Sequence, residues 1–175
     1  MSNLIEPSLA LLRVVAESPA SGEPGSLEFD PYVPLRFRTS AEPLGAAYVR
    51  LGNFATTLLE IQVEPLTQVL RGLTITAIDG LSGWPWFEVQ PIPAGLPVLG
   101  TPFDARVIVD IAQPFQLAIR PGEVVVWWGA LGGCIAGRHG DASFLIVNNL
   151  LTGIWFTGLL AAQTSLLTST VLAHR

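Results

Sequence analysis

The chain has 175 residues, half of them hydrophobic and 13% charged, and its net charge is −5. This composition is too apolar for an intrinsically disordered chain, and the length suits one domain with its own core. Because phosphate binding needs clustered Lys and Arg side chains, an acidic chain of this kind predicts no nucleic-acid partner.

The first part of the chain has the weakest periodicity. Residues 9–16 are uniformly apolar, so they fit either a short helix capped by Ser8 or a strand. Residues 27–29 and 35–38 alternate between apolar and polar side chains, which is typical of short strands. We therefore interpret residues 1–44 as an N-terminal arm with edge strands.

The clearest pattern lies in residues 54–79. Two runs, 59–63 and 73–77, alternate with a period of two and carry β-branched side chains, as half-buried strands do. Pro65 presets a turn and cannot donate a hydrogen bond to a sheet, so residues 64–68 predict the loop of a β-hairpin. The side chains that we expect to be buried together in one core are Leu59, Ile61, Val63, Leu73 and Ile75.

The next segment, residues 80–100, is rich in proline and predicts mostly loop, with one strand at residues 86–90. Residues 106–111 alternate again and predict a further strand.

A second hairpin is predicted by residues 115–120 and 124–128, which alternate on either side of a turn. Pro121 and Gly122 stand where a type II turn requires a fixed negative φ and then a positive φ.

Residues 129–141 contain five glycines and predict a flexible connection. After it, residues 144–147 and 154–160 predict a third hairpin around a loop at 148–153. The tail, residues 164–175, is rich in β-branched side chains and predicts a strand that closes a sheet.

The fold class that follows is all-β, with short antiparallel hairpins in a single-domain β-sandwich or a partly closed barrel. Residues 45–175 form the β core of this one domain. The first and third hairpins overlay when the sequence is shifted by 84 positions, so the core is either two pseudo-repeated halves or a set of unrelated hairpins. The overlay places Val63 on Val147, Leu66 on Leu150 and Leu70 on Ile154.

Candidate catalytic groups are few. His139 and Asp141 could form a base and its orienting carboxylate, but a polar tip exposed on a glycine-rich loop is the interpretation that we favour. Cys134 has apolar neighbours, and Glu60 and Glu64 lie on the solvent side of the first hairpin. We therefore expect no catalytic residue, no cofactor, no metal site and no enzymatic activity.

The stretch from 142 to 173 carries no charged residue, but Asn148, Asn149 and two glycines interrupt it too often for a membrane helix. We therefore expect no membrane insertion. We expect that a second copy of the chain or another protein covers the apolar surface that such strands would expose. The candidate interface residues are Trp84, Trp86, Trp128, Trp155 and Leu159.

The sequence is most consistent with a non-enzymatic protein-binding module. One form is a small acidic bacterial inhibitor or immunity-type protein that covers the active site of a toxin. An alternative is a carbohydrate-binding β-sandwich that uses Trp84 and Trp86 as a stacking platform. Another is a structural subunit of a phage particle or other assembly. The single cysteine and the lack of a basic N-terminal segment predict a cytoplasmic location.

Overall fold

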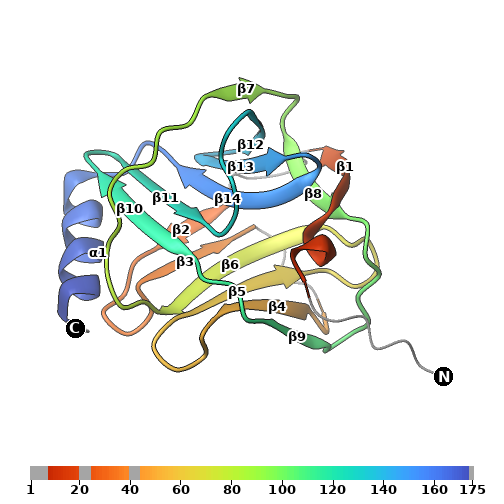
Figure 1. Cartoon of the computed structure of the whole chain (residues 1–175), viewed down its shortest axis with the longest axis horizontal. Helices are drawn as coiled ribbons and strands as arrows, with labels where there is room; N and C mark the ends of the chain where they lie inside the picture. The colour runs from red at the N-terminus through yellow and green to blue at the C-terminus, as the bar shows by residue number, and fades with distance from the viewer. Residues whose placement is uncertain (1–7, 20–24, 40–43, 174–175) are drawn as a thin grey trace.

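The computed structural model describes residues 8–19, 25–39 and 44–173, and strands dominate it (Figure 1). One short 3-10 helix, Leu9–Leu12, precedes the strands, and one α-helix, α1 (Ala161–Ala173), follows them. The strands are β1 (Val14–Pro19), β2 (Ser26–Glu28), β3 (Leu35–Arg38), β4 (Ala47–Gly52), β5 (Leu58–Val63), β6 (Leu70–Ala77), β7 (Val89–Pro91), β8 (Gly95–Leu99), β9 (Ile108–Ile111), β10 (Gln116–Arg120), β11 (Glu123–Trp127), β12 (Cys134–His139), β13 (Ala142–Val147) and β14 (Leu150–Phe156).

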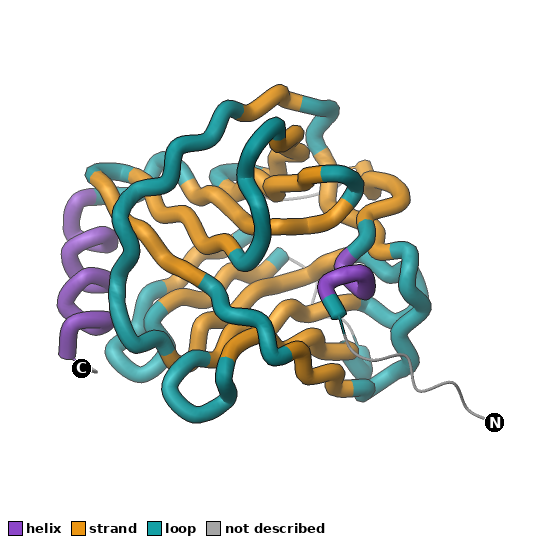
Figure 2. The backbone as a smooth tube through the Cα atoms, in the orientation of Figure 1, coloured by secondary structure: helices purple, strands orange, loops and turns teal. Residues whose placement is uncertain are grey.

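These strands form two six-stranded sheets that pack face to face, as the orange segments of Figure 2 show. The first sheet has the order β2-β3-β6-β5-β4-β9, and the second sheet has the order β10-β11-β14-β13-β12-β7. Strands β1 and β8 form a separate two-stranded ribbon. One isolated β-bridge, Val69–Val98, joins β8 to the start of β6 in the first sheet, and another, Arg13–Leu150, joins the start of β1 to β14 in the second sheet. The predicted all-β sandwich is confirmed, and the described strands close no barrel.

The two sheets have the same spatial order of strands, and the chain order also agrees for five of the six strands. It differs for the sixth, because β9 follows the other strands of its sheet whereas β7 precedes those of its own. Each has a hairpin at one edge, then three further antiparallel strands, then a last strand that pairs in parallel. Strand β5 coincides with β13 at a shift of 84 positions, which is the predicted offset. The five antiparallel strands of each sheet, β2–β6 and β10–β14, therefore have the same order in the two parts of the chain.

The predicted overlay is wrong beyond this first strand. Val63 pairs with Leu70 across a loop of residues 64–69, whereas Val147 pairs with Leu150 across a loop of residues 148–149. The structural equivalent of Leu70 is therefore Leu150 and not Ile154. Leu66, which has no counterpart in the second half, is 94% exposed in its loop.

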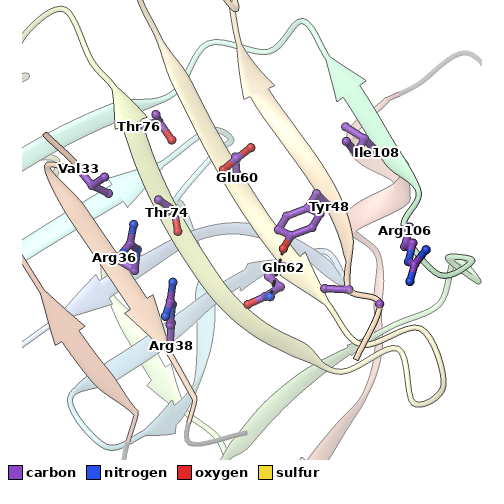
Figure 3. Close-up of a pocket in the computed structure, with 12 residues that line it drawn as sticks. Val33, Arg36, Arg38, Tyr48, Glu60, Gln62, Thr74, Thr76, Arg106 and Ile108 are labelled. Atoms are coloured by element: carbon purple, nitrogen blue, oxygen red, sulfur yellow. Dashed lines mark hydrogen bonds between the residues drawn. The ribbon is translucent and has the colours of Figure 1, made fainter. Parts of the chain in front are cut away.

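The first hairpin is confirmed with its register. Leu59 lies opposite Ile75, and Ile61 lies opposite Leu73. On the other face of the same strands, Glu60, Gln62 and Thr74 point away from the core (Figure 3). All five side chains that we expected to be buried belong to the main core: Leu59, Ile61, Val63, Leu73 and Ile75.

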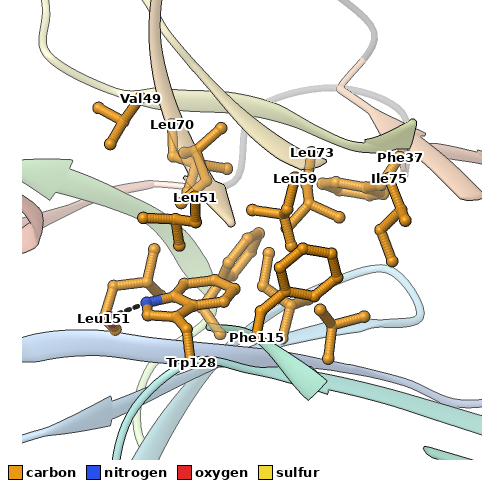
Figure 4. Close-up of a cluster of buried hydrophobic side chains, with 14 of the residues drawn as sticks. Phe37, Val49, Leu51, Leu59, Leu70, Leu73, Ile75, Phe115, Trp128 and Leu151 are labelled. Carbon is orange, nitrogen blue, oxygen red and sulfur yellow. Dashed lines mark hydrogen bonds between the residues drawn. The ribbon is translucent and has the colours of Figure 1, made fainter. Parts of the chain in front are cut away.

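The main core lies between the two sheets and includes a tryptophan (Figure 4). Trp128 is 2% exposed, and its indole N–H donates a hydrogen bond of 2.8 Å to the carbonyl of Leu151. Its neighbour Trp127 is half-buried on the opposite side, because successive side chains of an extended chain alternate. The hydrogen bond from Trp128 to Leu151 satisfies the one polar atom of this large buried side chain.

The second hairpin is also confirmed. Strands β10 and β11 pair from Gln116–Trp127 to Arg120–Glu123. Gly122 has a φ of +78°, the positive value that the third position of a type II turn requires.

The third hairpin exists, but its loop and second strand were placed wrongly. Only Asn148 and Asn149 connect β13 to β14, with φ values of +52° and +62°. Two residues with positive φ make a type I′ turn, whose twist matches that of the strands that it connects. The second strand therefore spans 150–156 and not 154–160.

The predicted flexible connection at residues 129–141 contains β12, which pairs with β13 on one side and with β7 on the other. The prediction was wrong because the glycines do not prevent this pairing: Gly137 lies opposite Phe144 in β13. His139, predicted to be exposed on a loop, is the last residue of β12 and is 4% exposed.

Residues 164–175 were predicted to form a strand, and this was wrong: residues 164–173 belong to helix α1. The last two residues of the prediction lie outside the described part of the chain. Thr164 and Thr168 donate hydroxyl hydrogen bonds to carbonyls of the same helix, at 3.0 and 2.8 Å. These bonds accommodate β-branched hydroxyl side chains in a helix. The buried residues Thr164, Leu167 and Val171 recur at helical spacing.

The remaining predicted elements are partly correct. For residues 9–16 the sequence allowed a short helix or a strand, and the structure contains both: a 3-10 helix capped by the Ser8 hydroxyl comes first, and β1 follows it. The strand predicted at 86–90 is found at 89–91, and β8 was not predicted. Among the described residues, no helix has the length and apolar character that crossing a membrane requires.

Candidate functional site

The outer face of the second sheet is covered by the chain itself. The segment between β6 and β7 crosses this face in front of β10 and β11 (Figure 1), and the amide of Ser82 donates to the Leu117 carbonyl at 2.8 Å. All six residues of β13 are buried, because one face of the strand packs in the main core and the other lies in the apolar cluster on the side of the covering segment. The surface that we expected another chain to cover is therefore covered in part by residues 81–92.

A hollow of about 720 Å³ lies where this segment meets the sheet, and we call it the aromatic hollow. Its lining residues come from the covering segment and from strands β10, β12, β13 and β14. The aromatic residues and arginines among them are Trp84, Trp86, Phe87, Arg120, Arg138 and Trp155.

Five side chains around the hollow form a closed ring of contacts. The guanidinium of Arg120 lies over Trp84 at 4.0 Å from the ring centre, and Trp84 stacks on Phe87 at 6.3 Å. Phe87 meets Trp155 edge-on at 5.6 Å, and the Trp155 indole N–H donates to Glu123 at 3.1 Å. Glu123 in turn accepts a hydrogen bond from the Nε of Arg120, which closes the ring. Each contact restricts the rotamers of the next, so the wall of the hollow is held in place.

A second, smaller apolar cluster lies beneath the hollow and anchors the covering segment to the sheet. The thiol of Cys134 donates to the Glu88 carbonyl at 3.3 Å. Burial raises the pKa of the Cys134 thiol, which keeps it protonated and unreactive. The buried members of this cluster are Ala118, Val125, Leu131, Cys134, Ala136, Leu145 and Val147.

Trp86 lies outside the ring of contacts and is 82% exposed. Pro85, the residue before it, restricts the backbone. Phe87, the residue after it, turns inward and packs against the sheet. The covering segment therefore exposes one large aromatic side chain, Trp86, to solvent, while the side chains on either side of it, Trp84 and Phe87, are held by their contacts.

The structure brings together three of the five candidate interface residues. Trp84, Trp86 and Trp155 line the aromatic hollow. Trp128 lies in the main core, and Leu159 lies apart, where its amide donates to the Gly122 carbonyl at 3.1 Å beside α1.

The sequence interpretation missed Phe87, Arg120 and Glu123. Phe87 continues the aromatic run that starts at Trp84, and this was the one available signal. Arg120 and Glu123 flank a predicted turn, but their contact with the aromatic residues depends on strand order. Strand β11 pairs with β14 so that Val125 lies opposite Trp155, and this pairing brings Glu123 within reach.

The other titratable groups that the structure describes do not assemble into a reactive cluster. His139 faces the interior, and neither ring nitrogen has a hydrogen-bond partner among the described residues, whereas the Asp141 side chain is 69% exposed. Glu64 binds Arg71 and Thr67, and these bonds lower its pKa. In the part of the chain that the structure describes, no three His, Cys, Asp or Glu residues lie together as metal ligands would.

No protein-family model matches this chain, and no curated protein has a significantly similar sequence.

Proposed function

We propose that this chain is a non-enzymatic protein-binding module whose partner docks on the aromatic hollow. The observation that carries the proposal is the position of Trp86, which is 82% exposed beside a hollow of about 720 Å³. Tryptophan and arginine are the residues that most often dominate the binding energy of protein interfaces. An exposed tryptophan next to a lined hollow offers a partner both an anchor and a pocket.

The ring of contacts around the hollow favours tight binding. Binding normally costs the entropy of ordering the side chains that meet the partner. Because Arg120, Glu123 and Trp155 already fix one another, that cost is low on this side of the interface. A hollow of this kind suits a partner that inserts an apolar side chain beside Trp86.

The net charge of −5 favours a partner with a basic surface, because opposite charges accelerate encounter. A small acidic inhibitor or immunity-type protein of bacterial origin, which covers the basic active site of a toxin, has this character. We place such a protein in the cytoplasm, where a free thiol such as Cys134 stays reduced.

Carbohydrate binding is the second proposal, and fewer observations support it. Arg120 covers one face of Trp84, and Phe87 packs on the same indole. That covered face is closed to a sugar ring, so Trp86 is the stacking platform that remains exposed at the hollow.

Self-association, as in a structural subunit, is the third proposal. It is supported by α1, a helix without a charged residue whose Leu166 and Leu172 are 39% and 48% exposed. Light scattering of Leu166→Glu and Leu172→Glu tests it, with Leu66→Glu as the control for an added charge at an exposed loop leucine. A monomeric wild-type protein at micromolar concentration would contradict it.

Affinity capture from the cells that encode the chain tests the first proposal. Immobilised wild type is compared with Trp86→Ala and with Tyr32→Ala, which removes an aromatic side chain that is 85% exposed elsewhere. We expect one protein to be retained by wild type and Tyr32→Ala and lost from Trp86→Ala. Equal retention by all three would contradict the proposal, and a glycan retained with the same selectivity would favour the second one.

A further inference from the structure

The aromatic hollow contains a hydroxyl group that the protein itself leaves without a partner. Ser143 of β13 lines the hollow and is 8% exposed. Its hydroxyl has no hydrogen-bond partner among the described residues. The ring nitrogens of His139 are unpartnered and also sealed from solvent, whereas the Ser143 hydroxyl stays open to the hollow. Because buried polar groups are normally hydrogen-bonded, this hydroxyl is where a bound molecule would make a polar contact.

Strand pairing fixes the neighbours of Ser143. It lies opposite Arg138 of β12 on one side and opposite Trp155 of β14 on the other. Side chains that lie directly opposite each other in antiparallel strands share a face, with Cβ atoms about 4.5–5.5 Å apart. All three residues line the hollow. The hydroxyl therefore lies between a guanidinium and an indole, close enough for one bound group to meet all three.

The space above Ser143 is open because its neighbours are small or lean away. Ala136 of β12 also lines the hollow and carries only a methyl group. The indole N–H of Trp155 donates to Glu123 of β11, and β11 lies on the side of β14 away from β13, so this ring leans away from Ser143. At the far end of the hollow, the amide of Ile92 donates to the Ala136 carbonyl at 3.0 Å, which fixes the covering segment to β12.

Arg138 adds hydrogen-bond donors at the edge of the hollow. The Nε of Arg138 donates to the Gly140 carbonyl at 2.8 Å, and this bond holds the side chain in place. The nearest carboxylate oxygen, on Asp141, lies 3.9 Å from Nη2, which is too long for a hydrogen bond. The terminal nitrogens of Arg138 therefore keep donors available for a bound acceptor.

The charges around the hollow favour a neutral group over an acid. Arg120 binds Glu123, and Asp141 lies beside Arg138, so each arginine already has a carboxylate nearby. A further carboxylate, that of Glu88, lines the hollow. An inserted acid would therefore meet three carboxylates and only two arginines.

We propose that the aromatic hollow receives a tyrosine side chain of the protein partner, an inference that rests on the proposed protein-binding function. Tyrosine has an apolar ring and a polar tip, which match the aromatic walls and the open hydroxyl of the hollow. The phenol accepts a hydrogen bond from Arg138 and donates one to Ser143. A phenylalanine or leucine would displace the water that bonds Ser143 in solution without replacing its hydrogen bond, which weakens binding.

Nuclear magnetic resonance titration of the indole N–H groups tests the proposal with three probes: the N-acetyl amides of tyrosine, phenylalanine and glutamate. We expect the tyrosine amide to shift the resonances of Trp86 and Trp155 with a dissociation constant of roughly 10 mM or below. The resonance of Trp128, which lies in the main core, should not move. The phenylalanine and glutamate amides should bind at least about threefold more weakly.

Ser143→Ala should remove the preference for tyrosine and leave the binding of the phenylalanine amide unchanged. The hydroxyl has no partner within the described protein, so its loss should not disturb the fold. Arg138→Gln should also weaken binding of the tyrosine amide. Ser165→Ala, which removes an exposed hydroxyl on α1, is the matched control and should bind all three probes as wild type does.

The tyrosine is refuted if its amide binds more weakly than roughly 10 mM, if its preference over the other two amides is smaller than about threefold, or if Ser143→Ala keeps that preference. Capture of the partner by Trp86→Ala tests docking separately. Loss of the partner from Trp86→Ala without a preference for the tyrosine amide would refute the tyrosine and leave docking on the hollow intact. Retention of the partner by Trp86→Ala would contradict the proposed function, even if the hollow prefers the tyrosine amide.

Discussion

The guanidinium of Arg120 lies 4.0 Å from the centre of the Trp84 ring and joins the edge hairpin of the second sheet to the segment that crosses it. The same guanidinium binds Glu123, which in turn accepts from Trp155. One arginine thus connects the covering segment to two strands. Without it, the segment would be held by its apolar contacts and by backbone bonds such as that of Ser82.

We predict that Arg120→Gln loosens the covering segment without unfolding the sandwich. The variant loses the cation–π contact and the ion pair, whose loss costs about 0.5–2 kcal/mol at a half-exposed position. Amide hydrogen exchange should become faster in residues 81–92 and stay unchanged in β5 and β6. Arg13→Gln serves as the control. Unchanged exchange at 81–92 would show that Arg120 does not hold the segment.

We predict that Ile61→Ala lowers the free energy of unfolding by about 2–5 kcal/mol, because it leaves a cavity in a packed core. Leu66→Ala, in the loop of the same hairpin, should change it by less than about 0.5 kcal/mol, because Leu66 is 94% exposed. Urea denaturation of the two variants measures the difference. Equal midpoints would contradict the register of the first hairpin.

We predict that Asn149→Val destabilises the fold by about 1–2 kcal/mol, because a β-branched residue is strained at a φ of +62°. Asn149→Gly should retain or exceed the stability of wild type, since glycine adopts this conformation freely. Thermal unfolding compares the three proteins. A valine variant as stable as the glycine variant would argue against the type I′ turn.

We predict that the buried imidazole of His139 makes the fold sensitive to mild acid. Burial, and then the positive charge of Arg71, lower the pKa of His139 below its ordinary value of 6.5. The unfolded chain therefore takes up the proton first, so stability is full above about pH 6.5 and falls as the pH drops through the window below it.

The variant His139→Leu should flatten this dependence, which urea denaturation between about pH 5 and 7 would measure. The lowered pKa of Glu64 acts in a separate window, below its ordinary value of 4.5, and so does not obscure the result. A wild-type stability that is constant across the histidine window would contradict the buried neutral state of His139.

The elements that the sequence predicted well are those with one buried face. In β5 and β6 the apolar residues Leu59, Ile61 and Leu73 alternate with polar residues, because the outer face of the first sheet meets solvent. The second sheet is covered on both faces, so β13 is buried along its whole length and shows no alternation. The apolar residues there predicted a surface that another chain would cover, but the sequence could not show that residues 81–92 cover part of it.

The errors have similar physical causes. The glycines of residues 129–141 indicated a flexible loop, although residues 134–139 form β12, which pairs with β13 and β7. The hydroxyl residues of α1 resembled a strand, although Thr164 and Thr168 satisfy their hydroxyls within the helix. For the aromatic hollow, the sequence indicated Trp84, Trp86 and Trp155 by residue type alone. Their contacts with Arg120 and Glu123 follow from strand order, which no local pattern in this chain encodes.

The most direct test of the central claim is the affinity of the captured partner for the purified wild type and for Trp86→Ala. If Trp86 is the anchor of the interface, its truncation should raise the dissociation constant by about 100-fold, whereas Tyr32→Ala should leave it within about twofold. A partner that binds wild type and Trp86→Ala with equal affinity would contradict docking on the aromatic hollow.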